Sequence, residues 1–254
     1  MRSANPALNN KTFEFEVTPE VQAARAAGQV MTLNGTVNKT ALLLLVLVMS
    51  ATTVWNRFFE SGGNPAAVKG WMMGGILVGL GLVIATMFKK HWAPLTAPAY
   101  AVAEGFALGG ISAMFEAMFP GIVMQAVALT MMVAFALLIA YRSGMIRATE
   151  NFKLGVAAAT GGIFLFYMLS MVLGFFGIQM PMLHSSGALG IGFSLFVVTI
   201  AALNLVLDFD FIEHGAATGA PKYMEWFAAL GLMVTLVWLY LEILNLLAKL
   251  NSRE

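Results

Sequence analysis

The stretch NLVLDFDFIE, residues 204–213, ends a long apolar segment and places two carboxylates, Asp208 and Asp210, where hydrocarbon would be expected. The segment is long enough to cross a membrane. A charged side chain inside a membrane span is costly, and it usually marks an ion path, a proton relay or a ligand site. The rest of the chain must therefore give these carboxylates partners or leave them to bind protons and cations.

The composition is that of a membrane protein. Of the 254 residues, 59% are hydrophobic and only 11% are charged, and the mean hydropathy is +0.82. Soluble domains carry about 25% charged residues, so we predict an all-α, polytopic membrane protein whose surroundings are the lipid bilayer. The net charge of +1, without a patch of Lys and Arg, gives no indication of a nucleic-acid partner. The absence of cysteine excludes disulfides, thiolate metal sites and thiol catalysis.

Seven apolar stretches are each about long enough to cross the roughly 30 Å hydrocarbon core. They indicate a seven-transmembrane-helix bundle over residues 40–250, preceded by a polar tail, residues 1–39, with one short helix at about 19–27. The stretches run over about 40–57, 70–88, 95–118, 121–141, 154–177, 188–212 and 225–248.

Lys and Arg residues predict the orientation, because cytoplasmic segments of membrane proteins carry an excess of them. With the N-terminus in the cytosol, the inner segments hold ten of these residues and the outer segments four. We therefore expect a cytosolic N-terminal tail and an external C-terminus.

Glycines recur at four-residue spacing, a pattern that lets transmembrane helices approach closely. The tripeptide Thr160-Gly161-Gly162 lies within a predicted span and is interpreted in the same way, as packing. The four-residue pairs are Gly70/Gly74, Gly75/Gly79 and Gly105/Gly109.

Four carboxylates lie within the predicted spans: Glu104, Asp208, Asp210 and Glu242. No Lys or Arg falls inside a predicted span, so these groups must be protonated, share protons or be neutralised by a mobile cation. A structural role, as a protonated acid in a packing hydrogen bond, is an alternative for any one of them. A bundle does not need four such costly groups.

Helical spacing separates the two aspartates of the opening stretch. Asp208 shares a face with Asn204, whereas Asp210 lies about 200° away and is expected to contact a neighbouring helix or the membrane interface. On the last span, Glu242 and Asn245 share a second polar face. We therefore name Asp208 as the interior residue, with Asn204 and Asn245 as supporting polar groups.

Several enzyme classes are disfavoured. The last span has no lysine in its middle that could form a retinal Schiff base, and the chain lacks the His-Glu-x-x-His and Gly-x-Ser-x-Gly motifs. We expect neither an enzyme nor a resident cofactor.

Three stretches together resemble the transmembrane Bax-inhibitor-motif family, in its bacterial branch. They are AEGFALGG at 103–110, LDFD at 207–210 and LYLEILNL at 239–246. The resemblance implies a multi-pass protein of the bacterial cytoplasmic membrane. It also implies a pH-sensitive calcium leak, gated by a carboxylate pair between the last two helices.

Residue by residue, the resemblance implies that Asp208 and Glu242 form this pair, with calcium as the ion that they bind, and that Glu104 lies in the ion path. The chain departs from the family pattern because Glu242 replaces an aspartate and because residues 112–116 lack the expected arginine. With the spans as predicted, Asp208 and Glu242 would differ in depth by about 18 Å. A direct pair would then require a longer sixth helix or an earlier start of the seventh.

Two functions follow as hypotheses. The first is a cation leak, with calcium as the ion and protons competing at Asp208, Glu242 and Glu104, since calcium prefers hard oxygen ligands. The second is a non-conducting regulator that binds another membrane protein, such as a quality-control protease or a stress factor, through the tail of residues 1–39.

Overall fold

The computed structural model describes residues 22–23, 26, 28–177 and 187–252. Seven of its helices are long and apolar enough to cross a membrane, which confirms the predicted all-α bundle of seven spans. The short helix expected at about 19–27 falls largely outside the described residues. The helices are α2 (Leu33–Glu60), α3 (Ala66–Phe88), α4 (Ala93–Met118), α5 (Ile122–Arg142), α6 (Glu150–Phe175), α8 (Ala188–Ala217) and α9 (Met224–Asn251), with a short 3₁₀ turn, η3 (Lys90–Trp92), before α4.

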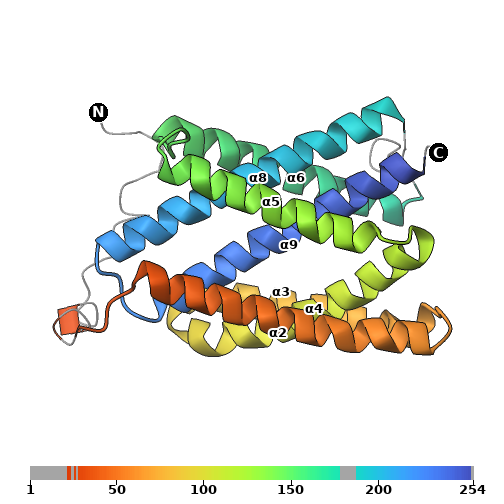
Figure 1. Ribbon diagram of the computed structural model, residues 1–254, viewed down its shortest axis with the longest axis horizontal. Coiled ribbons are helices and arrows are strands. Elements are labelled where there is room, and N and C mark those ends of the chain that lie inside the picture. The colour runs from red at the N-terminus through yellow and green to blue at the C-terminus, as the bar shows by residue number, and fades with distance from the viewer. Residues whose placement is uncertain (1–21, 24–25, 27, 178–186, 253–254) are drawn as a thin grey trace.

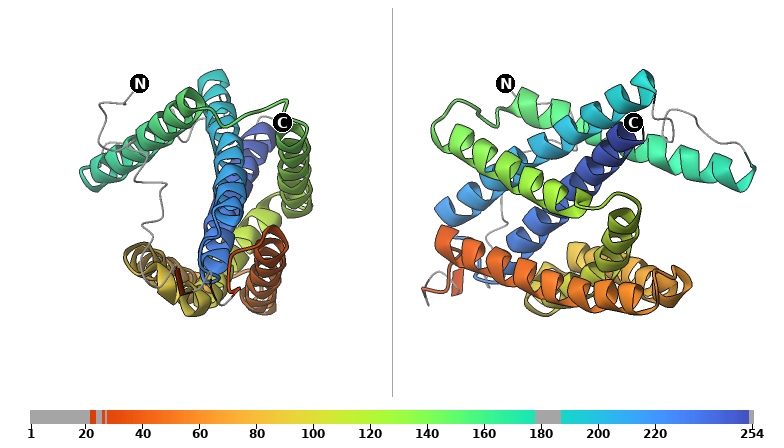
Figure 2. Two further views of the ribbon diagram at one scale, coloured as in Figure 1. Left: turned by 90° about the vertical axis from the view of Figure 1, so that its left-hand side faces the viewer. Right: turned by 45° about the vertical axis from the view of Figure 1, so that its right-hand side comes forward.

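Helix α9 is the centre of the bundle. It is the most buried of the seven spans and packs against α2, α4, α5 and α8. Helices α2, α3 and α4 form a group on one side of it, and α5, α6 and α8 lie on the other (Figure 1). Helix α6 is the least buried span and leans away from the rest of the bundle (Figure 2).

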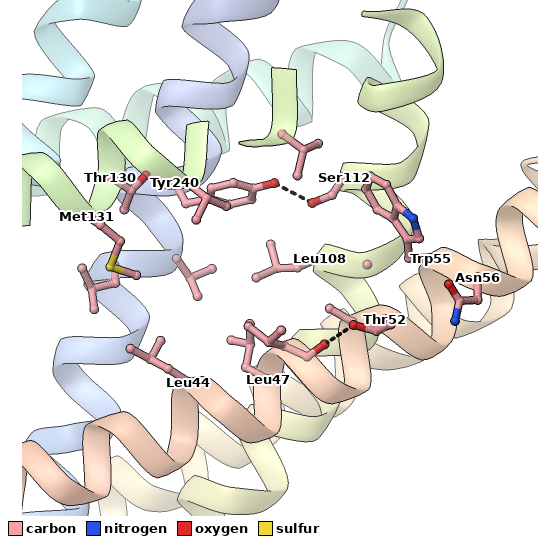
Figure 3. A pocket seen from close by; sticks show the side chains of 17 residues that line it. Leu44, Leu47, Thr52, Trp55, Asn56, Leu108, Ser112, Thr130, Met131 and Tyr240 are labelled. Atoms are coloured by element: carbon pink, nitrogen blue, oxygen red, sulfur yellow. Dashed lines mark hydrogen bonds between the residues drawn. The ribbon is translucent and has the colours of Figure 1, made fainter. Parts of the chain in front are cut away.

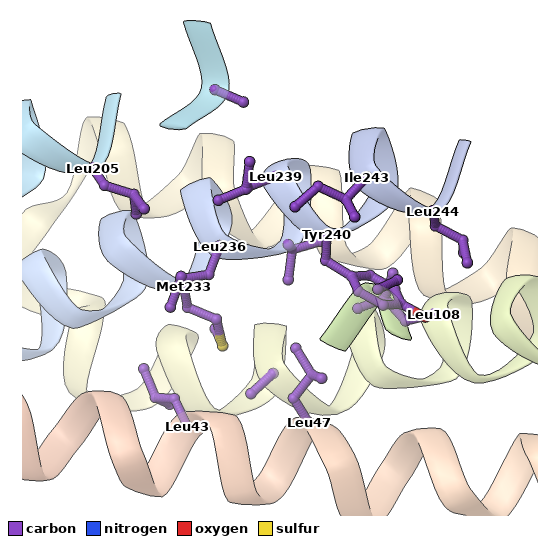
Figure 4. Packing of buried hydrophobic residues seen from close by; sticks show 14 of the residues in the cluster. Leu43, Leu47, Leu108, Leu205, Met233, Leu236, Leu239, Tyr240, Ile243 and Leu244 are labelled. Atoms are coloured by element: carbon purple, nitrogen blue, oxygen red, sulfur yellow. The ribbon is translucent and has the colours of Figure 1, made fainter. Parts of the chain in front are cut away.

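The main apolar core surrounds α9. Met233 and Leu239 of α9 are fully buried, and they meet Leu43 of α2 and Leu205 of α8 in one cluster (Figure 4). Because α9 contacts four other helices, about two thirds of its apolar span is buried. The core therefore fixes α9 and leaves α6 attached mainly through α8.

Two helices extend beyond their apolar stretches. Helix α2 begins at Leu33 rather than near residue 40, because the Thr32 hydroxyl caps it by accepting from the Gly35 amide at 3.0 Å. Helix α8 continues to Ala217 rather than ending near residue 212. The carboxylates of the opening stretch therefore lie inside a regular helix rather than at its end.

The glycine spacing is confirmed where α4 meets α2 and α3. A Cβ on Gly109 would lie 2.2 Å from the Ala51 carbonyl oxygen, and one on Gly75 would lie 2.4 Å from the Ala103 oxygen. Both distances are too short for any side chain, so only glycine permits these backbone approaches.

The packing interpretation is wrong for two other sets of glycines. Nothing lies within 4 Å of a Cβ built on Gly70 or Gly74 of α3, or on Gly161 or Gly162 of α6. Gly70 and Gly74 line an open groove between α3 and α4 without bringing the two backbones into contact, and the four-residue pattern alone could not show which glycines meet a neighbouring helix.

Candidate ion-path residues

A line of polar side chains follows α8 across the bundle, with partners on α6 and α9. We call this line the polar column. Its members occur at successive depths along α8, from the end nearest the α8–α9 loop to the opposite end. In that order the contacts are Asp210 with Lys153, Asp208 with Thr235, Asn204 with Thr160, Glu242 with Tyr167, and Lys249 with Ser194.

Asp208 points from α8 towards α9, as its helical phase predicts. It interacts with the side chain of Thr235, and its Oδ1 would lie 3.9 Å from a Cβ built on Gly231. Its Oδ2 is buried and has no hydrogen-bond partner among the described residues. An unpaired carboxylate oxygen in such a place is an acceptor available to a proton or a cation.

Asp210 faces away from Asp208 and contacts α6, which confirms the prediction that it meets a neighbouring helix. Its Oδ2 lies 2.7 Å from the Lys153 Nζ, with 28% of the aspartate side chain exposed. Between these charges and the next carboxylate, Asn204 donates from Nδ2 to the Thr160 hydroxyl and to the Ile200 carbonyl, both at 2.8 Å. The polar face assigned to Asn204 and Asp208 is thus in contact with both neighbouring helices.

Glu242 occupies the other half of the polar column. Its Oε1 accepts hydrogen bonds from the Tyr167 hydroxyl at 2.9 Å and from the Trp238 indole at 3.2 Å. Its Oε2 is buried without a partner among the described residues, like the Oδ2 of Asp208. Asn245, three residues farther along α9, is half-buried.

The carboxylate pair implied by the resemblance is not formed in this structure. Asp208 lies beside Thr235, which precedes Glu242 by seven residues and therefore by about 10 Å along the helix axis. The gap is smaller than the 18 Å expected from the sequence because α8 continues to Ala217. The parts of the chain that the structure describes also contain no cluster of three or more His, Asp or Glu side chains that could hold a metal ion.

Lys249 is a buried basic residue that the sequence interpretation missed, and the prediction that no base lies within a span is wrong here. Only 6% of the residue is exposed, and its Nζ donates to the Ser194 hydroxyl at 2.8 Å and to the Gly190 carbonyl at 3.3 Å. It also interacts electrostatically with Glu242, two helical turns earlier. The seven-residue spacing from Glu242 was the available signal, but Lys249 lies one residue beyond the predicted end of the last span, at about residue 248.

Glu104 lies apart from the polar column. It sits on α4 next to Tyr100, and a Cβ on Gly79 of α3 would lie 3.3 Å from its Oε2. Its surroundings are therefore the α3–α4 interface, on the opposite side of the bundle from α6. The structure brings together Asp208, Asn204 and Glu242 in one line, but not Glu104.

A second buried charge was also missed. Glu225 at the start of α9 is fully buried and forms an ion pair with Lys39 of α2. Its Oε1 accepts from the backbone amide and the hydroxyl of Thr32, both at 2.9 Å. We call Thr32, Lys39 and Glu225 the N-terminal clasp. Because 186 residues separate Lys39 from Glu225, no local spacing could have predicted it.

A family model provides an independent comparison. The model described as Bax inhibitor 1 like matches residues 5–252, nearly the whole chain. The chain belongs to this family. Searches of curated proteins and of solved structures gave no match. As a Bax inhibitor 1 like protein with seven spans, it is an integral, multi-pass membrane protein.

Proposed function

We propose that this Bax inhibitor 1 like protein is a pH-sensitive cation leak, with calcium as the main ion, in a bacterial cytoplasmic membrane. The observation that supports the proposal most is the polar column, which crosses the bundle and contains three carboxylates, two of which, Asp208 and Glu242, have one buried oxygen without a partner among the described residues. The role is non-enzymatic.

Asp208 and Glu242 supply the chemistry of this path. A carboxylate oxygen is a hard ligand that suits calcium, and a buried one without a donor is stabilised when it binds a proton or a cation. With separate partners about 10 Å apart along α9, the two groups act as successive binding positions rather than as one site. Because each position offers few of the six to eight oxygen ligands that calcium prefers, the ion would bind weakly, which favours conduction over storage.

Two lysines set the charge at the ends of the polar column. Lys153 pairs with Asp210 at one end, and Lys249 is held by Ser194 and interacts with Glu242 at the other. Positive charge at the mouth of a path opposes the entry of cations. Movement of either lysine away from the column would therefore favour conduction, and the conformation described here corresponds to a restricted path.

The test is calcium flux into liposomes that contain the full chain and enclose a calcium-sensitive dye. We expect Asp208→Asn and Glu242→Gln each to reduce flux by about tenfold, since each removes a charge from the path. The control is Glu60→Gln, at an exposed position at the end of α2 and away from the polar column, and this change should leave flux unaltered. Glu104→Gln should have a smaller effect than either column variant, because Glu104 faces α3.

Two results would contradict the proposal. One is flux in both column variants equal to that of the wild type. The other is a folded wild-type protein that passes no calcium between pH 6 and pH 8, at about 100-fold gradients. The second result, combined with capture of a membrane-protein partner through residues 1–39, would support the non-conducting regulator instead. Under the proposal, wild-type flux changes with pH, and this dependence weakens when Asp208 or Glu242 is replaced.

A further inference from the structure

A groove of about 400 Å³ opens between α2 and α5, on the side of α9 away from the polar column (Figure 3). Helices α2 and α5 do not pack against each other here, and α4 and α9 form the floor. The floor residues Leu108 and Val237 are only 5% and 7% exposed. At the mouth, Val48 of α2 and Val127 of α5 are 57% and 40% exposed.

The hydroxyl groups that line the groove already have partners. The Ser112 hydroxyl and the Tyr240 hydroxyl share a hydrogen bond of 2.6 Å. The Thr130 hydroxyl donates to the Ala126 carbonyl at 2.7 Å, within α5. The Thr52 hydroxyl donates to its own helix in the same way, at 2.8 Å. A groove whose hydroxyls are satisfied offers little to ordered water and favours an apolar occupant.

The length of the groove matches half of a membrane. Its lining on α2 runs from Leu44 to Asn56, thirteen residues that span about 18 Å along the helix axis. One leaflet contributes about 15 Å to the hydrocarbon core. The lined parts of α4 and α5 lie near the short connection between these helices, at the end of the bundle where α2 terminates. With the N-terminus in the cytosol, this is the outer leaflet.

We propose that the α2–α5 groove binds one acyl chain of an outer-leaflet phospholipid. A transmembrane helix of a partner, about 10 Å wide, would lie across the mouth rather than along the floor, where Leu108 and Val237 are only 5% and 7% exposed. A free fatty acid would bring a carboxylate, but no Lys or Arg lines the groove. A phospholipid keeps its charged headgroup at the interface, beyond Asn56, and its tail restores the dispersion contacts that an unfilled groove would lose.

The test uses the full chain in nanodiscs that contain a phospholipid with a photoreactive diazirine on its acyl chain. After illumination, mass spectrometry locates the labelled residues. We expect label on Leu108 and Val237, which bulk lipid around the bundle does not reach. Val127→Trp should reduce this floor labelling by about tenfold, because the indole fills the mouth.

Leu129→Trp is the matched control, since Leu129 lies on the same helix, is 38% exposed and does not line the groove. It should leave floor labelling unchanged, and Thr52→Phe, which blocks the mouth from α2, should repeat the effect of Val127→Trp. Label confined to exposed residues, or an equal effect of Val127→Trp and Leu129→Trp, would overturn the proposal. Stronger floor labelling by a photoreactive free fatty acid than by the phospholipid would overturn the choice of ligand.

Discussion

The α2–α4 interface and the α6–α8 interface are built in opposite ways. At the first, glycines on α4 let the backbones approach so closely that a Cβ on Gly109 would overlap Ala51. At the second, the glycines of α6 are open, with nothing within 4 Å of a Cβ built on Gly155, Gly161 or Gly162. The α2–α4 interface is thus held by close approach of the two backbones, and the α6–α8 interface by contacts between side chains.

The polar groups follow the same division. At the α2–α4 interface, the Thr40 hydroxyl donates to a carbonyl of its own helix. The Ser50 hydroxyl lies 3.0 Å from two carbonyls of its own helix and reaches the Ala101 carbonyl of α4 at 3.4 Å, a backbone group rather than a side chain. Beside α6, by contrast, Asn204 and Glu242 reach to side chains on a different helix. Hydrogen bonds between transmembrane helices contribute only about 0.6 kcal/mol each on average. We therefore expect the α2–α4 interface to be rigid. Helix α6, which borders the polar column, is expected to move more freely.

Gly109→Ala is the strongest test of this division. The new methyl group would lie 2.2 Å from the Ala51 oxygen, so α2 and α4 must separate, and we expect a loss of about 3 kcal/mol in the free energy of unfolding. The measurement is reversible unfolding in mixed micelles. Gly161→Ala on α6 is the control, with a gain of up to about 1 kcal/mol from helix propensity. Equal losses of unfolding free energy in the two variants would show that the α2–α4 and α6–α8 interfaces do not differ in this way.

Glu225→Gln tests the attachment of α9 to α2. The variant leaves Lys39 without its carboxylate in a largely buried place, although the amide can still accept from Thr32. We therefore expect a loss of about 2 kcal/mol, below the usual range for a broken buried pair because Lys39 is 17% exposed and can reach water. Asp210→Asn, which breaks the more exposed pair with Lys153, should cost about 0.5 kcal/mol in the same assay.

The smallest expected effect is the coupling between Thr160 and Asn204. A double-mutant cycle with Thr160→Val and Asn204→Leu should give a coupling energy of about 0.6 kcal/mol, because one interhelical hydrogen bond is involved. Pairing Thr199→Val with Asn204→Leu provides the reference, since the Thr199 hydroxyl donates within its own helix. A coupling above about 2 kcal/mol would show that α6 is held as firmly as α2.

The sequence was sufficient for what depends on hydrophobic length and helical phase. Seven apolar stretches predicted seven spans, and the 200° between Asp208 and Asp210 correctly placed Asp208 towards the interior and Asp210 against a neighbouring helix. These are properties of single helices. They do not depend on which helix lies beside which.

What the sequence could not predict depends on the crossing of distant helices. Lys249 is buried because the end of α9 passes the start of α8, where Ser194 and Gly190 accept from it. The Asp208–Glu242 pair was expected from resemblance, but the relative position of α8 and α9 puts Thr235 beside Asp208 instead. Neither the depth of a helix end nor the register between two helices is determined by composition.

The N-terminal clasp has a consequence for biosynthesis. Thr32 and Lys39 begin the first span, whereas Glu225 begins the last, and the Met31 amide also donates to the Ala220 carbonyl at 2.7 Å. During synthesis α2 enters the membrane before α9 is made, so Lys39 has no Glu225 carboxylate to pair with until α9 is inserted. Closure of the clasp therefore marks the insertion of α9, and a polypeptide truncated before residue 225 would leave Lys39 without this carboxylate.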